Sequence, residues 1–470
     1  MTTDVLFVAL DGADPTLINQ WTQSGDMPVL NELMQNWQTQ PVLSPPGFGD
    51  GVFWTSLYTG CNAGRHAHYF PWQFNPQTYQ TDTFVYDLHF MRDPFWLYAS
   101  KMGRRVGIVD LYTAPLLQGL DGVQVMDWMI HDRTAKPRSW PEPVIESLHE
   151  NFMPDPLRGN SEEIEARSEI DWVQMHEGIC SRIRAKADAV GGMLSGNEWD
   201  LFAVGFCDAH DIGHQSWHWH DPSAPNHPGE WVGRHGNPVL QTYRELDAAL
   251  EKVISSAGAR EVFLVAGIGM GMQTTCNPAF DEMLAHFSGH AGNRQQLRER
   301  VAERPYFALS HNMNSGALRI NLKGRERMGI VEPDDYDRVC DELEENLRGI
   351  TDAESGIPVV DHCVRIRKAF KGDHTDRLPD MMVVWQRQRR VTRLKVPGRD
   401  DLEIVPHIVI ERRSGDHTPD AMLVSSQFYG TGPDIDPDLK IPVESIAPTV
   451  GRALGIRIPG LDQKPLRKVA

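Results

Sequence analysis

Short, continuous apolar runs recur along this chain, and longer stretches with a helical pattern separate them. A run without polar alternation is typical of a strand buried on both faces of a parallel sheet. Strands that alternate with helices predict an α/β fold, here a doubly wound, mostly parallel sheet with helices on both faces. The apolar runs are residues 5–10, 106–110, 201–206, 262–266, 382–385 and 422–425, and the helical stretches are 15–34, 164–194, 239–257 and 334–347.

Two long segments do not fit this alternation. Residues 115–156 are loop-rich and contain several prolines, and residues 272–325 combine a polar helical part with the run Ser310-His311-Asn312. Loop-rich insertions of this kind commonly cover an active site at the strand ends. Because the sequence has no repeat, no low-complexity tract and no clear linker, we expect one domain over residues 1–470 with cap insertions at 115–156 and 272–325.

Charge and composition narrow the range of partners. The net charge is −18, from 46 basic and 64 acidic residues. This balance argues against a general nucleic-acid binder or a binder of anionic membranes, because both need a basic surface. A small anionic substrate stays compatible with it, since a bound metal can reverse the local field. The sequence leaves open whether the chain forms an oligomer.

The chain carries signals of its compartment. No apolar run approaches the roughly 20 residues of a membrane span. The first residues, Met1-Thr2-Thr3-Asp4, lack the basic region and the cleavage site of a signal peptide. The six cysteines form no C-x-x-C pair, which fits a reducing compartment. These patterns predict a cytoplasmic protein.

Two histidines four residues apart are the first candidates for chemistry. His210 and His214 follow the apolar run 201–206, at the strand end where α/β sheets usually bind ligands. On a helix this spacing places both imidazoles on one face, which suits two ligands of one metal ion. The alternative is a polar surface turn, since further histidines follow at 218, 220 and 227.

Three more polar residues lie in similar positions. Asp11 directly follows the first strand, where an aspartate can bind a metal or can cap the next turn. Residues 41–53 are predicted as a loop, so Thr55 should open a helix, either as its N-cap or as a nucleophile beside a metal. Ser56 is the neighbouring alternative. His417, in Gly415-Asp416-His417, is either a third ligand or a surface histidine.

Taken in order, these motifs resemble the alkaline phosphatase superfamily, and within it the type I phosphodiesterase/nucleotide pyrophosphatase branch. The resemblance spans nearly the whole chain and depends on the order and spacing of several short motifs. The motifs are Val8-Ala9-Leu10-Asp11-Gly12-Ala13, Met27-Pro28-Val29-Leu30-Asn31-Glu32-Leu33, Trp54-Thr55-Ser56-Leu57-Tyr58-Thr59-Gly60, Gly64-Arg65-His66, Gly415-Asp416-His417 and Ser445-Ile446-Ala447-Pro448-Thr449-Val450.

The resemblance implies a first metal site at His210, His214 and His417. His210 stands where the family usually has aspartate, and a three-histidine set favours Zn²⁺ or another divalent transition metal over Mg²⁺. Asp208 and Asp211 flank His210 and are alternative ligands.

The family's second metal site usually takes the first-strand aspartate, the nucleophile and a Ser-Asp-His-Gly-Met motif. Asp11 and Thr55 match the first two, but the third falls on Ala266-Gly267-Ile268-Gly269-Met270, which has no ligand side chain. We therefore expect one ion rather than two. Restoring aspartate at 267 and histidine at 268 is expected to create the second site. Groups that could replace the charge of the second ion are Arg65, His66, His68 and His311.

These residues predict an enzyme: a metal-dependent hydrolase or transferase that acts on a small phosphate (phosphodiester) or sulfate ester through Thr55. Two alternatives remain at this point. The chain could be a catalytically degenerate family member that binds a ligand or partner, or a single-metal enzyme with different chemistry.

Overall fold

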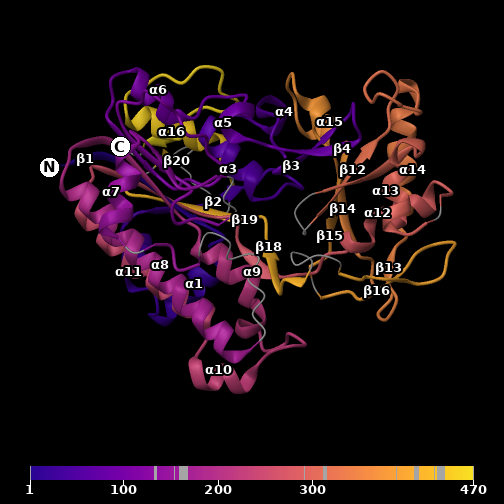
Figure 1. Cartoon of the computed structure of the whole chain (residues 1–470), viewed down its shortest axis with the longest axis horizontal. Coiled ribbons are helices and arrows are strands. Elements are labelled where there is room, and N and C mark those ends of the chain that lie inside the picture. The colour runs from indigo at the N-terminus through magenta and orange to yellow at the C-terminus, as the bar shows by residue number, and fades with distance from the viewer. Residues whose placement is uncertain are drawn as a thin grey trace.

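The structure of the protein is a computed structural model that describes residues 2–131, 135–152, 154–157, 168–290, 292–310, 315–387, 389–406, 412–427, 429–430 and 440–468. A large sheet and a smaller sheet lie side by side in Figure 1, with helices packed against both. The predicted residues 164–167 and 311 lie outside the described part of the chain.

The main sheet has nine strands in the order β21-β2-β19-β9-β1-β8-β5-β6-β7. Its centre is parallel: β1 pairs in parallel with both β8 and β9, and β5 pairs in parallel with β8 and β6. Only β19 and β7 run opposite to the rest among the described strands. The predicted α/β fold with a mostly parallel sheet is therefore confirmed. The strands are β1 (Thr3–Asp11), β2 (Gln38–Leu43), β5 (Val106–Val109), β6 (Gly122–Met126), β7 (Arg138–Trp140), β8 (Trp199–Phe206), β9 (Glu261–Gly267), β19 (Asp420–Ser425) and β21 (Ile441–Pro442).

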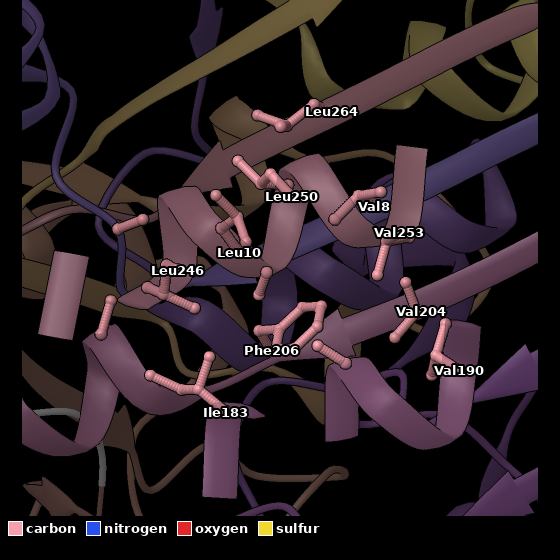
Figure 2. Close-up of a cluster of buried hydrophobic side chains, with 14 of the residues drawn as sticks. Val8, Leu10, Ile183, Val190, Val204, Phe206, Leu246, Leu250, Val253 and Leu264 are labelled. Atoms are coloured by element: carbon pink, nitrogen blue, oxygen red, sulfur yellow. The ribbon is translucent and has the colours of Figure 1, made fainter. Parts of the chain in front are cut away.

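Helices cover both faces of this sheet, which explains why its central strands are apolar throughout. Successive side chains of β1 point to opposite faces. Leu6, Val8 and Leu10 pack into one apolar cluster, while Val5 and Phe7 pack into another. Figure 2 shows the first cluster, where side chains of β1, β8 and β9 meet those of two long helices. These helices are α8 (Glu169–Ser195) and α11 (Pro238–Ala257), and the opposite face carries α3 (Asp50–Thr59), α6 (Phe95–Lys101) and α16 (Ile446–Ala453).

The smaller sheet is antiparallel and has its own apolar cluster. The apolar run 382–385 is a strand, as predicted, but it lies in this sheet and not in the main one. The two expected cap insertions are placed differently: 115–156 contributes the edge strands β6 and β7, whereas 272–325 enters the smaller sheet. The elements of this part are α12 (Asn277–Phe287), β11 (Tyr306–Leu309), β12 (Ser315–Ile320), α14 (Tyr336–Arg348), β14 (Val360–Arg365) and β15 (Met381–Trp385).

The segment before Thr55 differs from the prediction. Residues 41–53 are not one loop, because β2 extends to Leu43 and α3 already begins at Asp50, with Gly49 as its N-cap. Thr55 therefore lies in the middle of α3 and does not cap it. Every residue of α3 is buried, so the helix has no amphipathic period that would mark its start in the sequence.

Among the described residues, no helix combines the length and the apolar character that a membrane span needs.

Candidate metal centre

The carboxyl ends of three parallel strands bring the candidate residues to one edge of the main sheet. Asp11 ends β1 and is in register with Gly267 at the end of β9. After β8 the chain turns directly into α9 (Asp208–His220). Gly12, with a φ of +70°, allows the end of β1 to approach the backbone of His210 so closely that a Cβ at Gly12 would clash with it. The geometry of the sheet therefore places Asp11 beside His210.

Three histidines converge at this edge. His210 and His214 lie one turn apart on α9, and His417 lies on β18 (Gly415–His417), which pairs with β10 (Met270–Met272). The ring centroids are 4.4 Å apart for His210 and His214, 4.7 Å for His210 and His417, and 4.9 Å for His214 and His417. One nitrogen of each ring lies within 4.8 Å of the other two, and all three side chains are buried. In the view of Figure 1, α9 and β18 lie between the main sheet and the smaller one.

Backbone carbonyls orient two of these rings as metal ligands require. His214 Nδ1 lies 2.9 Å from the carbonyl of Gly415, and His417 Nδ1 lies 3.3 Å from the carbonyl of Ile268. Such a bond fixes the Nδ1–H tautomer and leaves the lone pair for a metal on Nε2. His417 Nε2 is buried and has no hydrogen-bond partner among the described residues. Burial lowers the pKa of His417, which favours the neutral ring that binds metal. The three-histidine set thus fits Zn²⁺ or a similar ion.

Asp11 makes two hydrogen bonds to neighbouring side chains. Its Oδ1 accepts from Trp54 Nε1 at 2.6 Å, and its Oδ2 lies 2.9 Å from His131 Nε2. The His131 ring also stacks on His210, with centroids 3.8 Å apart. Asp11, His131 and His210 form a second group whose ligand atoms could hold an ion, but it shares His210 with the first. We favour the three-histidine group as the metal site, because backbone carbonyls hold the rings of His214 and His417 in the orientation that metal ligands need.

The sequence prediction missed His131 and Asp50. His131 lies in the segment read as a cap insertion, with no spacing that links it to Asp11. Asp50 lies in the first turn of α3, and its Oδ2 is 3.7 Å from His210 Nε2 and 3.9 Å from His417 Nε2. A correct helix start at Asp50 would have marked this carboxylate as a candidate.

Thr55 lies on a different side of α3 from Asp50. Five residues along a helix correspond to a rotation of about 140° around its axis. The Thr55 hydroxyl is buried and lies 3.1 Å from His68 Nδ1, and His68 Nδ1 also lies 3.2 Å from the carbonyl of Gly51. The structure therefore pairs Thr55 with His68, while Asp50 faces the histidine triad.

The remaining predicted residues have other neighbours. Arg65 forms an ion pair with Asp462, and buried His66 lies 3.0 Å from the hydroxyl of Ser56 through Nε2. His311 lies outside the described residues. The alternative ligands Asp208 and Asp211 both form buried ion pairs with Arg182.

Gly267 and Ile268 contribute no side chain to the metal centre. Ile268 is buried in the apolar cluster behind α3, and only its carbonyl faces His417. Gly267 has a φ of +151°, and a Cβ there would lie 2.5 Å from the Cβ of Ala421. This crowding at Gly267 argues against the expectation that aspartate at 267 and histidine at 268 would create a second metal site.

We expect the substitution Gly267→Asp to destabilise the fold by about 3 kcal/mol, from overpacking against Ala421 and a backbone conformation that L residues rarely adopt. Urea unfolding followed by fluorescence measures this loss. Gly192→Ala is the matched control, because Gly192 has open space around it in α8 and alanine favours a helix. Equal stability of Gly267→Asp and the wild type would contradict the packing described here.

Comparison with known proteins gives a consistent result. The profile of the type I phosphodiesterase / nucleotide pyrophosphatase family matches residues 5–415. Phosphonoacetate hydrolase from Sinorhizobium meliloti 1021, solved with phosphonoformate, superposes with a TM-score of 0.58 at 12% identity, over 97% of this chain and 95% of that one. Murine ectonucleotide pyrophosphatase / phosphodiesterase 5 in an inactive form with AMP superposes with a TM-score of 0.50 at 12% identity, over 98% and 97%.

No curated protein matches the chain significantly in sequence. The family match covers most of the chain and includes the end of β1, all of α9 and the start of β18. The chain therefore belongs to the type I phosphodiesterase / nucleotide pyrophosphatase family of the alkaline phosphatase superfamily, a family of phosphoester hydrolases.

Proposed function

We propose that this protein hydrolyses a small phosphodiester with one divalent transition-metal ion, Zn²⁺ by preference, held by His210, His214 and His417. The observation that carries the proposal is the convergence of three buried imidazoles at the ligand-binding edge of the sheet. A bound ion would act as a Lewis acid on an ester oxygen. The family membership supplies the reaction class.

The helix α3 supports an anionic substrate at the same edge. Its first turn, at Asp50, lies beside His210 and His417. A helix N-terminus carries a partial positive charge and unpaired N–H groups, and both favour a phosphate group nearby. In this proposal water attacks the phosphorus, because Thr55 is turned about 140° away from the side of α3 that faces the triad.

A panel of esters tests the reaction class. Bis(4-nitrophenyl) phosphate, 4-nitrophenyl phosphate and 4-nitrophenyl sulfate are supplied to the zinc-loaded protein, and release of nitrophenol is measured. We expect the diester to be hydrolysed faster than the other two. Thr55→Val should keep turnover within about tenfold of the wild type, whereas loss of a true nucleophile costs several orders of magnitude. If the Thr55→Val protein is folded and zinc-loaded but has no turnover, Thr55 and not water is the nucleophile.

One observation favours a second candidate, a family member that binds a ligand without turnover. Asp11 is already hydrogen-bonded to Trp54 and His131, and positions 267–268 offer no ligand side chain, so a second ion at Asp11 would have to share His210 with the first. Tight binding of a phosphate ester by the zinc-loaded protein, with no hydrolysis of any ester in the panel, would select this candidate.

A further inference from the structure

We propose that Asp50 is the fourth protein ligand of the ion, so that the site is a set of three histidines and one carboxylate, to which an ester oxygen would add as a fifth ligand. This inference depends on the metal site of the proposed function, and it adds a ligand from α3, whereas the three histidines lie on α9 and β18.

The distances fit a shared ion. Asp50 Oδ2 lies 3.7 Å from His210 Nε2 and 3.9 Å from His417 Nε2. In a tetrahedral zinc site with bonds of about 2.0–2.1 Å, two ligand atoms lie about 3.4 Å apart. Movements of a few tenths of an ångström would therefore bring this oxygen into the coordination shell of an ion bound to the triad.

The burial of Asp50 supports the same role. Its side chain is 7% exposed, although it carries a formal charge at neutral pH. A buried carboxylate is costly unless it is paired with a positive group or coordinates a metal. An ion held between this carboxylate and the imidazoles of His210 and His417 would be such a positive group.

The other carboxylates near the triad form hydrogen bonds or ion pairs with other groups. Asp11 is bonded through both oxygens, to Trp54 and to His131. Asp208 pairs with Arg182 on the far side of α9, and Asp416 accepts a hydrogen bond of 2.7 Å from the backbone N–H of His417. Asp50 is the carboxylate whose described contacts are with two members of the triad.

Affinity for zinc gives the first test. The protein is stripped of metal, and its dissociation constant for Zn²⁺ is measured by competition with a chromophoric chelator. Asp50→Asn keeps the shape of the side chain and removes its charge, so we expect affinity to fall by about 100-fold, as for loss of one ligand from a preformed site. Asp247→Asn is the matched control, because Asp247 is a buried carboxylate on α11 that accepts hydrogen bonds from the backbone N–H groups of Val29 and Leu30, and it should bind zinc as tightly as the wild type.

The second test looks for a new absorption band in a variant, and it does not depend on turnover. In the Asp50→Cys protein loaded with Co²⁺, a thiolate at residue 50 that binds the ion produces a thiolate-to-cobalt charge-transfer band in the near ultraviolet. The wild type has six cysteines elsewhere and serves as the baseline. Circular dichroism of the metal-free proteins establishes that each variant is folded.

The outcomes separate this inference from the proposed function. Weaker zinc binding in Asp50→Asn together with the new band in Asp50→Cys supports Asp50 as a ligand. Wild-type affinity in Asp50→Asn, with no band in Asp50→Cys, overturns that role while leaving the three-histidine site intact. A wild-type protein that binds no Zn²⁺ overturns the metal site and Asp50 together.

Discussion

His214→Ala is expected to lose the bound ion and at least about a thousandfold of the phosphodiesterase rate, because removing one of three imidazoles leaves too few strong ligands and removes the Lewis acid. His214 is buried on α9, and the Gly415 carbonyl fixes its ring. The wild type purified without added metal should contain about one equivalent of ion by elemental analysis. The same analysis of His214→Ala should find almost none.

His362→Ala is the control for this result, since His362 is an exposed histidine with 53% of its side chain accessible. It should keep both the ion and the rate. Full metal content in the His214→Ala protein would show that the ion is held elsewhere, for example by the group of Asp11, His131 and His210.

Arg182→Met is expected to destabilise the protein by about 3–5 kcal/mol, because it leaves two buried carboxylates without their cation. Arg182 on α8 is completely buried and pairs with Asp208, at 2.7 Å, and with Asp211, both also completely buried. These pairs attach α9, which carries His210 and His214, to α8. Urea unfolding should therefore show the largest loss among the variants considered for stability.

Arg184→Met provides a matched control on the same helix. Arg184 pairs with Glu245, but 53% of its side chain is exposed, so its loss should cost no more than about 1 kcal/mol. Adding Asp208→Asn and Asp211→Asn to Arg182→Met should recover part of the loss, because the buried charges are then gone. The penalty of Arg182→Met should also shrink at acid pH, where Asp208, whose pKa is raised by burial, takes up a proton. Equal stability of Arg182→Met and Arg184→Met would contradict the claim that the buried ion pairs of Arg182 stabilise the fold.

The sequence predicted the main sheet well because burial leaves a clear signal there. The strands β1, β8 and β9 are covered on both faces, and each reads as an unbroken apolar run. The same signal could not assign a strand to a sheet. The run 382–385 is equally apolar, but it pairs with β12 and β14 in the smaller sheet, which depends on contacts distant in the sequence.

The spacing of His210 and His214 and the family resemblance at His417 predicted three side chains that converge in the structure, but the contribution of α3 was misplaced. The prolines and glycines of residues 45–49 suggested a loop that continued to Thr55, and the fully buried helix gave no periodic pattern to correct it. Asp50 was therefore overlooked, and Thr55 was assigned the position at the helix start. His131 was missed for another reason: only the fold brings it to Asp11, 120 residues away in the chain.

The central claim is that one ion binds through Nε2 of His210, His214 and His417. Anomalous diffraction at the zinc absorption edge, from crystals of the zinc-loaded protein, tests it most directly. The account predicts a single anomalous peak at bonding distance from these three nitrogens, with an oxygen of Asp50 as a further ligand. Two peaks about 4 Å apart, with Asp11 as a ligand of the second ion, would contradict it, since that is the arrangement of a two-metal site.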